Sequence, residues 1–420
     1  MSGVHASHRP TGSSPRAVRS VVALVLLSAV AVAVGAVVLW PPHLHVRVPA
    51  ALQAQGGPVQ TVAGEVTGVV TAPCGGQGDT VGQPVPPATA AAVPTVGAYT
   101  CDRVAVLLRS GPERDQATVL EISPGPGQPV LAVGEGLRMA RAASSVPGPG
   151  SVTYYYADVA RGVPLAVLAL VFAVVVVLVG RWRGVAALAG LGVTFGVLLV
   201  FVIPALLAGE SPLGVAVVGT AGLALVVLYL AHGVSLRTSA ALLGTLGALA
   251  LTAVLGRIAV PGTHLTGLAD EQNTSVQAYA SKVQISGLLL AGLVIGAVGV
   301  LNDVTVTQAS AAFELAEDPC RSRARVFAAA MRVGRDHIAS TVYTLVLAYA
   351  GAALPVLLLL SISGRAVTDV LTGDLVGEEI VRTAVGGIGL ALAVPITTGL
   401  AVLLACPGGS VRVASGSLEP

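Results

Sequence analysis

The stretch ISGLLLAGLVIGAVGVL, residues 285–301, contains no Asp, Glu, Lys or Arg. A helix needs about 20 apolar residues to cross the hydrocarbon core of a bilayer, so this stretch and its flanks suffice for one crossing. Outward from it in both directions lie seven further uncharged apolar runs: Val21–Trp40, Val163–Val179, Val185–Leu207, Leu213–Ala231, Ala240–Leu255, Ile338–Leu360 and Ala384–Leu404. The sequence therefore predicts a mostly α-helical, polytopic transmembrane bundle of about eight helices.

The composition of the whole chain supports this class. Of 420 residues, 54% are hydrophobic and only 10% are charged, whereas soluble domains carry about 25% charged residues. The formal net charge of +2 gives no basic excess for binding nucleic acid. No P-loop, dinucleotide fingerprint, HExxH or nucleophile-elbow pattern is found, so we expect no cofactor and no enzymatic activity.

The basic residues indicate the orientation of the bundle, because short cytoplasmic loops are rich in Lys and Arg. With the N-terminus inside, the cytoplasmic loops and tails hold twelve basic residues: Arg9, Arg16, Arg19, Arg181, Arg183, Arg237, Arg321, Arg323, Arg325, Arg332, Arg335 and Arg412. The short outer loops hold four: Arg257, Lys282, Arg365 and Arg382. This predicts a bacterial plasma-membrane protein with cytoplasmic tails at 1–20 and 406–420. The run at 21–40 is longer than the apolar core of a signal peptide and is expected to be a retained anchor.

Residues 41–160 differ from the seven-helix region at 161–405 and are expected to form an extracytoplasmic domain between helices one and two. Pro/Gly-rich stretches there separate short runs typical of strands. These runs are Gly64–Thr71, Arg103–Arg109, Ala117–Ile122, Gly136–Ala142 and Val152–Tyr156. The pattern predicts a small β-rich barrel or sandwich, and an OB-like barrel fits it.

Cys74 and Cys101 are the only cysteines in this outer domain. The compartment permits a disulfide between them, which would stabilise the domain by roughly 3 kcal/mol on the chain-entropy model. The alternative is a pair of free buried thiols. Cys320 and Cys406 should remain reduced in the cytoplasm. His43 and His45 lack supporting ligands, so no metal site is assigned.

Ionisable residues at membrane depth are functional candidates by default. None lies within the eight runs, but the sixth run continues into Asn302 and Asp303. At a helical period, four residues fall on one face and form a predicted polar stripe: Asp303, Thr307, Ser310 and Glu314. The helix is expected to continue beyond the membrane as an amphipathic extension.

The start of the seventh span is also polar, with candidate residues Arg335, Asp336, His337, Ser340 and Thr341. If spans six and seven are adjacent, these residues and Asp303 would form one cluster. The alternative is that Asp303 and Asp336 only pair with nearby arginines.

The eighth span carries two further signals. It opens with Glu379 and Arg382, where a carboxylate in the first turn would suit the helix dipole. Pro355 in the preceding span and Pro395 in this one indicate kinks or broken helices.

Four motifs resemble the YibE/F-like family of multi-pass bacterial membrane proteins, over roughly residues 157–398. They are Gly287–Ser310, Gly334–Val342, Leu347–Pro355 and Glu378–Thr383. The resemblance implies a permease-like membrane protein of unassigned substrate. The family pattern has an Asp at the position of Asn302, so this sequence lacks the second carboxylate that a role with two neighbouring carboxylates there would need.

Three functions are weighed. A permease-like transporter or exporter, with a cation as candidate driving ion, would use Asp303 and the start of span seven. An accessory or receptor protein would instead bind a partner or ligand through the outer domain. An intramembrane enzyme with Asp303 and Asp336 as a carboxylate pair is disfavoured, because neither lies in a protease-like motif. The lipid bilayer is the one partner predicted; an oligomer is left open.

Overall fold

The structure is a computed structural model that describes residues 15–41, 60–74, 100–123, 128–143, 152–268, 271–280, 282–318 and 321–406. The chain divides into two compact units, Met1–Val46 with Val176–Pro420, and Arg47–Val175. We describe the helical unit and the β unit separately.

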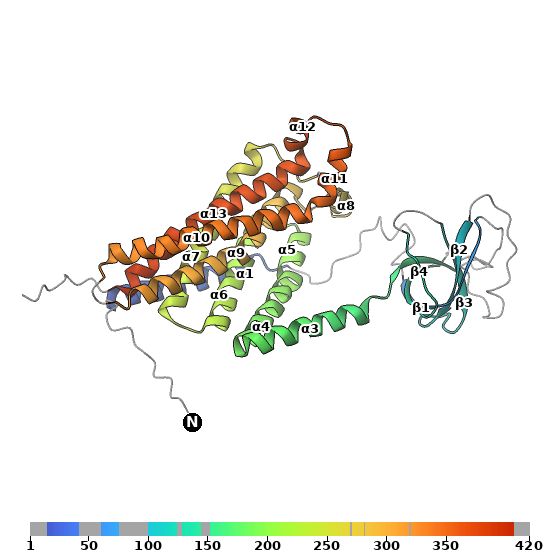
Figure 1. Ribbon diagram of the computed structural model, residues 1–420, viewed down its shortest axis with the longest axis horizontal. Coiled ribbons are helices and arrows are strands. Elements are labelled where there is room, and N and C mark those ends of the chain that lie inside the picture. Colours follow the sequence, from blue (N-terminus) through green and yellow to red (C-terminus); the bar gives the residue numbers. More distant parts are fainter. Residues whose placement is uncertain are drawn as a thin grey trace, which may run out of the picture. The chain divides into compact units, whose positions relative to one another are not determined.

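The helices follow the predicted apolar runs closely (Figure 1). They are α1 (Pro15–Val38), α3 (Gly162–Gly180), α4 (Trp182–Val197), α5 (Ile203–Ala208), α6 (Pro212–His232), α7 (Leu236–Gly262), α8 (Glu271–Tyr279), α9 (Ile285–Leu315), α10 (Arg323–Ala352), α11 (Leu354–Ile362), α12 (Val367–Leu371) and α13 (Asp374–Ala405). Within the described residues, seven spans are long and apolar enough to cross a membrane, and the bent pair α10–α11 makes an eighth. The prediction of a multi-pass helical protein agrees with this count.

Helices α7, α9 and α13 pack against one another and form the centre of the helical unit. Their contact surfaces are built from Ala, Val and Leu, as in the buried cluster around Ala248, Leu301, Val304 and Leu390. Small residues let the backbones approach closely, which is the main source of helix association within a bilayer. Helix α10 packs on α9 and α13 at the edge of this centre.

Two spans depart from regular α-helix at a proline. Between α4 and α5 the chain forms one π-helical stretch, Leu198–Val202, just before Pro204. Proline lacks the N–H of a regular turn, and a wider turn accommodates it. At Pro355 the seventh span bends by 61° between α10 and α11, as the proline signal predicted. Pro395 behaves differently, because α13 runs unbroken past it; the broken-helix interpretation of that position is wrong.

Three helices begin or end beyond their apolar runs. Helix α9 continues to Leu315, as expected for an extension past the membrane. Helix α10 starts at Arg323, well before the polar helix start predicted at 334–337, because its first turns are rich in Ala and Arg and favour helix without being apolar. Helix α13 starts at Asp374, so Glu379 lies in its second turn and the first-turn capping role predicted for Glu379 is wrong.

The β unit contains five strands, β1 (Gln60–Pro73), β2 (Thr100–Leu108), β3 (Ala117–Ile122), β4 (Gly136–Ala143) and β5 (Val152–Val159), close to the predicted runs. All pairs are antiparallel and the strand order is β3-β2-β1-β4-β5. The long strand β1 is central, and a register shift between Val66 and Gly68 interrupts its pairing with β2. Such bulges bend a strand, and the sheet is strongly curled (Figure 1).

Alternate residues of these strands fill one core. Val66, Val104, Leu108, Leu137 and Met139 are fully buried within it. The short strands predicted from the Pro/Gly-rich punctuation therefore form one hydrophobic centre of their own.

Candidate functional site

One side of α9 carries no large apolar side chain. Its outward-facing positions follow steps of three and four residues, which keep them on one face. A Cβ atom added at Gly292 or Gly299 would meet nothing within 4 Å. We call this face the α9 stripe and define it by Gly292, Gly296, Gly299, Asp303, Thr307, Ser310 and Glu314, of which Ser310 is half-buried.

Asp303 of this stripe lies beside His337 of α10. The Asp303 Oδ2 to His337 Nε2 distance is 3.9 Å, and the side chains are 74% and 31% exposed. Local bonds hold both turns, since Thr307 Oγ1 donates to the Asp303 carbonyl oxygen and Thr341 Oγ1 to that of His337. The structure thus brings together two of the residues that the sequence placed in one polar cluster, from two different helices.

Farther along the same face, towards the N-terminal end of α9, three helices meet around Tyr349. A Cβ at Gly296 would lie 3.2 Å from the Tyr349 hydroxyl oxygen, so the tyrosine ring reaches from α10 onto the glycine face. The Arg382 guanidinium of α13 lies 5.9 Å from the ring centroid, within the range of a cation–π contact. Arg382 also donates to Glu379 Oε1 at 2.5 Å. Arg382 of the predicted pair on the eighth span therefore contacts α10 near the stripe, and Glu379 holds Arg382.

Other predicted residues stand apart from these contacts. Arg335, Asp336 and Ser340 are exposed, and within the described ranges their side chains make no ion pair or hydrogen bond. The alternative in which Asp303 and Asp336 pair with arginines is not observed there. Asn302 is half-buried, and its Oδ1 has no hydrogen-bond partner among the described residues.

A buried polar cluster lies on the opposite face of α9. The hydroxyls of Thr245 on α7 and Thr305 on α9 are hydrogen-bonded at 2.6 Å. Gln308 Nε2 donates to the Ala330 carbonyl oxygen of α10 at 2.8 Å and to Thr398 Oγ1 of α13 at 2.7 Å. These bonds connect α9 to α7, α10 and α13 through its buried face. The α9 stripe, on the other face, is therefore turned away from the centre of the bundle.

Sequence reasoning missed this cluster, although α9 contained a signal for it. The buried positions Leu301, Thr305, Gln308 and Ala312 also follow steps of three and four residues. Asp303 and Glu314 were selected from the sequence because they are charged. Uncharged Thr and Gln can instead be buried once their hydrogen bonds are made within the bundle.

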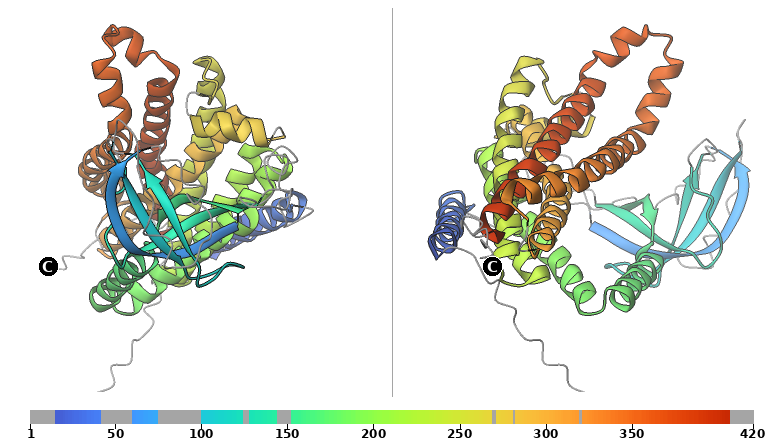
Figure 2. Two further views of the ribbon diagram at one scale, coloured as in Figure 1. Left: turned by 90° about the vertical axis from the view of Figure 1, so that its right-hand side faces the viewer. Right: turned by 60° about the vertical axis from the view of Figure 1, so that its left-hand side comes forward.

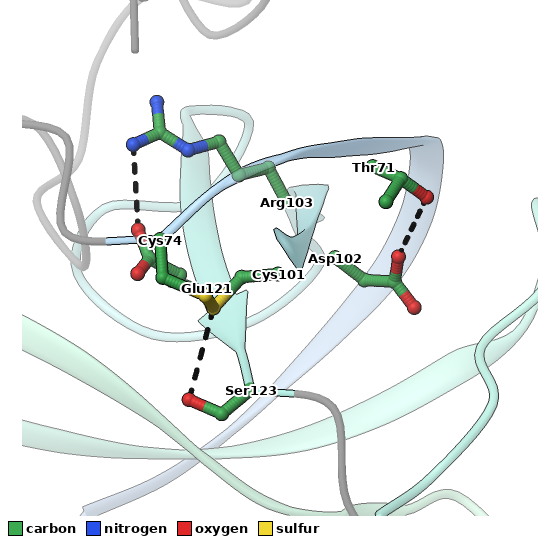
Figure 3. Close-up of a disulfide and its surroundings, with 7 residues drawn as sticks. All are labelled: Thr71, Cys74, Cys101, Asp102, Arg103, Glu121 and Ser123. Carbon is green, nitrogen blue, oxygen red and sulfur yellow. Dashed lines mark hydrogen bonds and ion pairs between the residues drawn. A yellow bond between two sulfur atoms is a disulfide. The ribbon is translucent and has the colours of Figure 1, made fainter. Parts of the chain in front are cut away.

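The β unit contains a disulfide between Cys74 and Cys101 (Figure 3). Beside it, the almost buried Arg103 pairs with Glu121 at 3.3 Å. Cys74, Cys101 and Glu121 are the one group of His, Cys, Asp or Glu within the described ranges that is close enough to share a metal ion. In the disulfide form the sulfurs are not thiolates and are therefore not metal ligands.

A second polar group connects the segment between β2 and β3 to strands β4 and β5. Arg141 donates two hydrogen bonds to Glu113, at 2.9 and 2.6 Å, and the Tyr154 hydroxyl donates a third at 2.6 Å. The bonds from Arg141, with a smaller contribution from Tyr154, lower the pKa of Glu113 from 4.5 to about 2, against the effect of burial. Burial and the Glu113 carboxylate raise the pKa of Tyr154. We interpret this group as structural.

His43, His45 and Cys320 lie outside the described residues.

The long apolar helices, their mutual packing and the polar face of α9 define a multi-pass membrane protein. The sequence profile of the YibE/F-like proteins matches residues 168–406, more than half of the chain. The protein belongs to the YibE/F-like family, as its motifs indicated. No curated protein and no solved structure matches the chain.

Proposed function

We propose that this protein is a permease-like transporter whose substrate pathway follows the α9 stripe. The observation that carries the proposal is the contrast between this face and the surface of other helices. Helix α3 exposes Val163, Leu168 and Phe172, side chains suited to lipid, whereas the α9 stripe offers glycine backbone, hydroxyls and carboxylates. The glycine part of the stripe lies at membrane depth and leaves room along α9, and its polar part, from Asp303 on, lies at and beyond the membrane boundary. A face of this kind favours a route for polar solutes over a lipid contact.

The distribution of basic residues supports an orientation of the chain in the membrane. Both termini are proposed to be cytoplasmic, in a bacterial plasma membrane, because the basic residues cluster in the corresponding loops. The β unit then faces the outer, oxidising side, where its disulfide would be stable. We also propose that this unit is an OB-like barrel, since β1 pairs with both β2 and β4, and β3 approaches β5.

The pathway is tested by blocking the stripe with a large side chain. Gly299→Leu would fill the α9 stripe, and its Cβ meets no neighbour, so folding should be preserved. Gly192→Leu on α4 is the matched control, because Gly192 is equally exposed and unobstructed but lies on another helix.

The full chain would be reconstituted in liposomes on a solid-supported membrane. Currents would be recorded on exchange into amino acids, nucleosides, sugars and dicarboxylates. We expect a current with at least one of these classes, lost in Gly299→Leu and kept in Gly192→Leu. Wild-type currents no larger than those of empty liposomes, or an unimpaired Gly299→Leu variant, would contradict the proposal.

An accessory function of the β unit is a second candidate, favoured by its exposed apolar side chains Val70, Val130 and Tyr155. Replacing all three with Ser would abolish an activity that depends on partner binding. If instead the currents above persist in this variant, the helical unit alone carries the function.

A further inference from the structure

The Asp303–His337 pair joins two helices at one point of the α9 stripe. Asp303 lies 18 residues beyond Ile285, the start of α9, or about 27 Å at 1.5 Å per residue. This is close to the full thickness of a hydrocarbon core of about 30 Å. The pair therefore stands near one end of the proposed pathway, about 10 Å along α9 from Gly296, where the Tyr349 hydroxyl lies.

The chemistry of the pair favours a proton as its ligand. Imidazole is the side chain that gains and loses a proton near neutral pH, and Asp303 places a carboxylate beside that of His337. Hard cations such as Na⁺ and Mg²⁺ require several oxygen ligands, and the pair supplies one carboxylate. A transition metal would need further His, Cys or carboxylate ligands, and in the described ranges the one group near enough to share a metal lies in the β unit.

The surroundings leave this pair without a competing charge from the neighbouring helices. Residues 383–405 of α13 and 238–256 of α7 contain no ionisable side chain. On α6 the one titratable side chain besides Tyr229 is His232, its last residue. On α10 the adjacent charges are Arg335 and Asp336, and both are exposed without a partner among the described residues.

We infer that Asp303 and His337 form the proton-coupling site of this protein, an inference that rests on the proposed transport function. A proton binds His337 Nε2, a buried atom with no hydrogen-bond partner among the described residues, and the ion pair with the Asp303 carboxylate is then neutral overall. Loss of that proton leaves a net charge of −1 on the pair. Protonation therefore changes the net charge of the pair, and with it the electrostatic attraction between Asp303 on α9 and His337 on α10, which gives the two helices two states of different stability.

The test needs no substrate. The full chain in liposomes on a solid-supported membrane is given a pH step, and the displaced charge is recorded. We expect a transient current in the wild type, and its loss in both Asp303→Asn and His337→Gln. Asp336→Asn is the matched control: it removes a neighbouring carboxylate that does not contact His337, and it should retain the wild-type current.

Size-exclusion profiles and thermal unfolding midpoints would show that each variant is folded. A wild-type current in Asp303→Asn or His337→Gln overturns the inference, as does an equal loss in Asp336→Asn. Failure of the transport proposal is separate, because the Gly299→Leu test depends on solute-driven currents, whereas the pH step reports proton binding alone.

Discussion

Glu113 accepts hydrogen bonds from two residues on different strands, Arg141 on β4 and Tyr154 on β5. Its side chain is 16% exposed and that of Arg141 is 14% exposed. A charged bidentate bond in such a setting is stronger than an exposed ion pair, and removing one partner leaves the other charge poorly solvated. This carboxylate should therefore contribute strongly to the stability of the β unit.

We expect Glu113→Gln to lower the free energy of unfolding of the β unit by about 2–3 kcal/mol at neutral pH. The reason is that folding lowers the pKa of Glu113 from 4.5 to about 2, and solvent screening reduces the corresponding free energy. The folded-state pKa is depressed, so this stability is present above pH 4.5 and is lost as the pH falls towards 2. The measurement is the midpoint temperature for protease cleavage within residues 100–159 of the full chain, followed across this pH range.

Glu65→Gln is the control, because the Glu65–Arg109 ion pair is 39% and 49% exposed and should matter little. Equal shifts in the two variants would show that burial of the Glu113 group has no special weight.

At the scale of elements, close packing of α7 against α13 depends on glycine at defined positions. A Cβ at Gly389 of α13 would collide with Thr252 Oγ1 of α7, whereas a Cβ at Gly387 would meet nothing within 4 Å. Both residues belong to the same helix. The two glycines therefore separate the effect of interhelical space from that of helix propensity.

We expect Gly389→Ala to destabilise the bundle by about 1–3 kcal/mol through overpacking. Gly387→Ala should instead be neutral or stabilising by up to about 1 kcal/mol, since Ala is the better helix former. Thermal unfolding of the full chain in detergent measures both. Similar midpoints for the two variants would mean that α7 and α13 can separate at no cost.

The elements were largely predictable because their signals are local. Apolar length identified the spans, and Pro/Gly punctuation identified the strands. The start of α10 at Arg323 was not predictable from hydropathy, because an Arg-rich helix outside the membrane has no apolar run.

The site was predicted only in part. Asp303 and His337 come together as expected, since the polar stripe and the polar start of span seven both pointed there. The hydrogen bonds of Gln308 to α10 and α13 depend on which helices are neighbours. That choice arises from packing between residues far apart in sequence, and a local pattern does not contain it.

At the scale of the whole molecule, the proposed orientation places the two ends of α10–α11 on opposite sides of the membrane. Ser322, before α10, and Thr368, in α12, are both exposed. Their accessibility from one side or the other therefore reports the topology directly.

We expect a cysteine at Thr368→Cys to react with a membrane-impermeant maleimide in intact cells. A cysteine at Ser322→Cys should react only after permeabilisation, because the adjoining arginines retain it inside. Both are made with Cys320→Ser and Cys406→Ser, and that background alone should stay unlabelled. Labelling of Ser322→Cys in intact cells would reverse the topology.

The bridge between Cys74 and Cys101 spans 27 positions of the sequence, and this has a practical corollary for biochemistry. If a host enzyme hydrolyses one peptide bond inside that covalent ring, the two fragments remain a single molecule through their sulfurs. A nicked preparation then migrates as intact material on a non-reducing gel, and separates into two bands only after treatment with a thiol. Gels run under both conditions are therefore needed before the integrity of a purified sample is accepted.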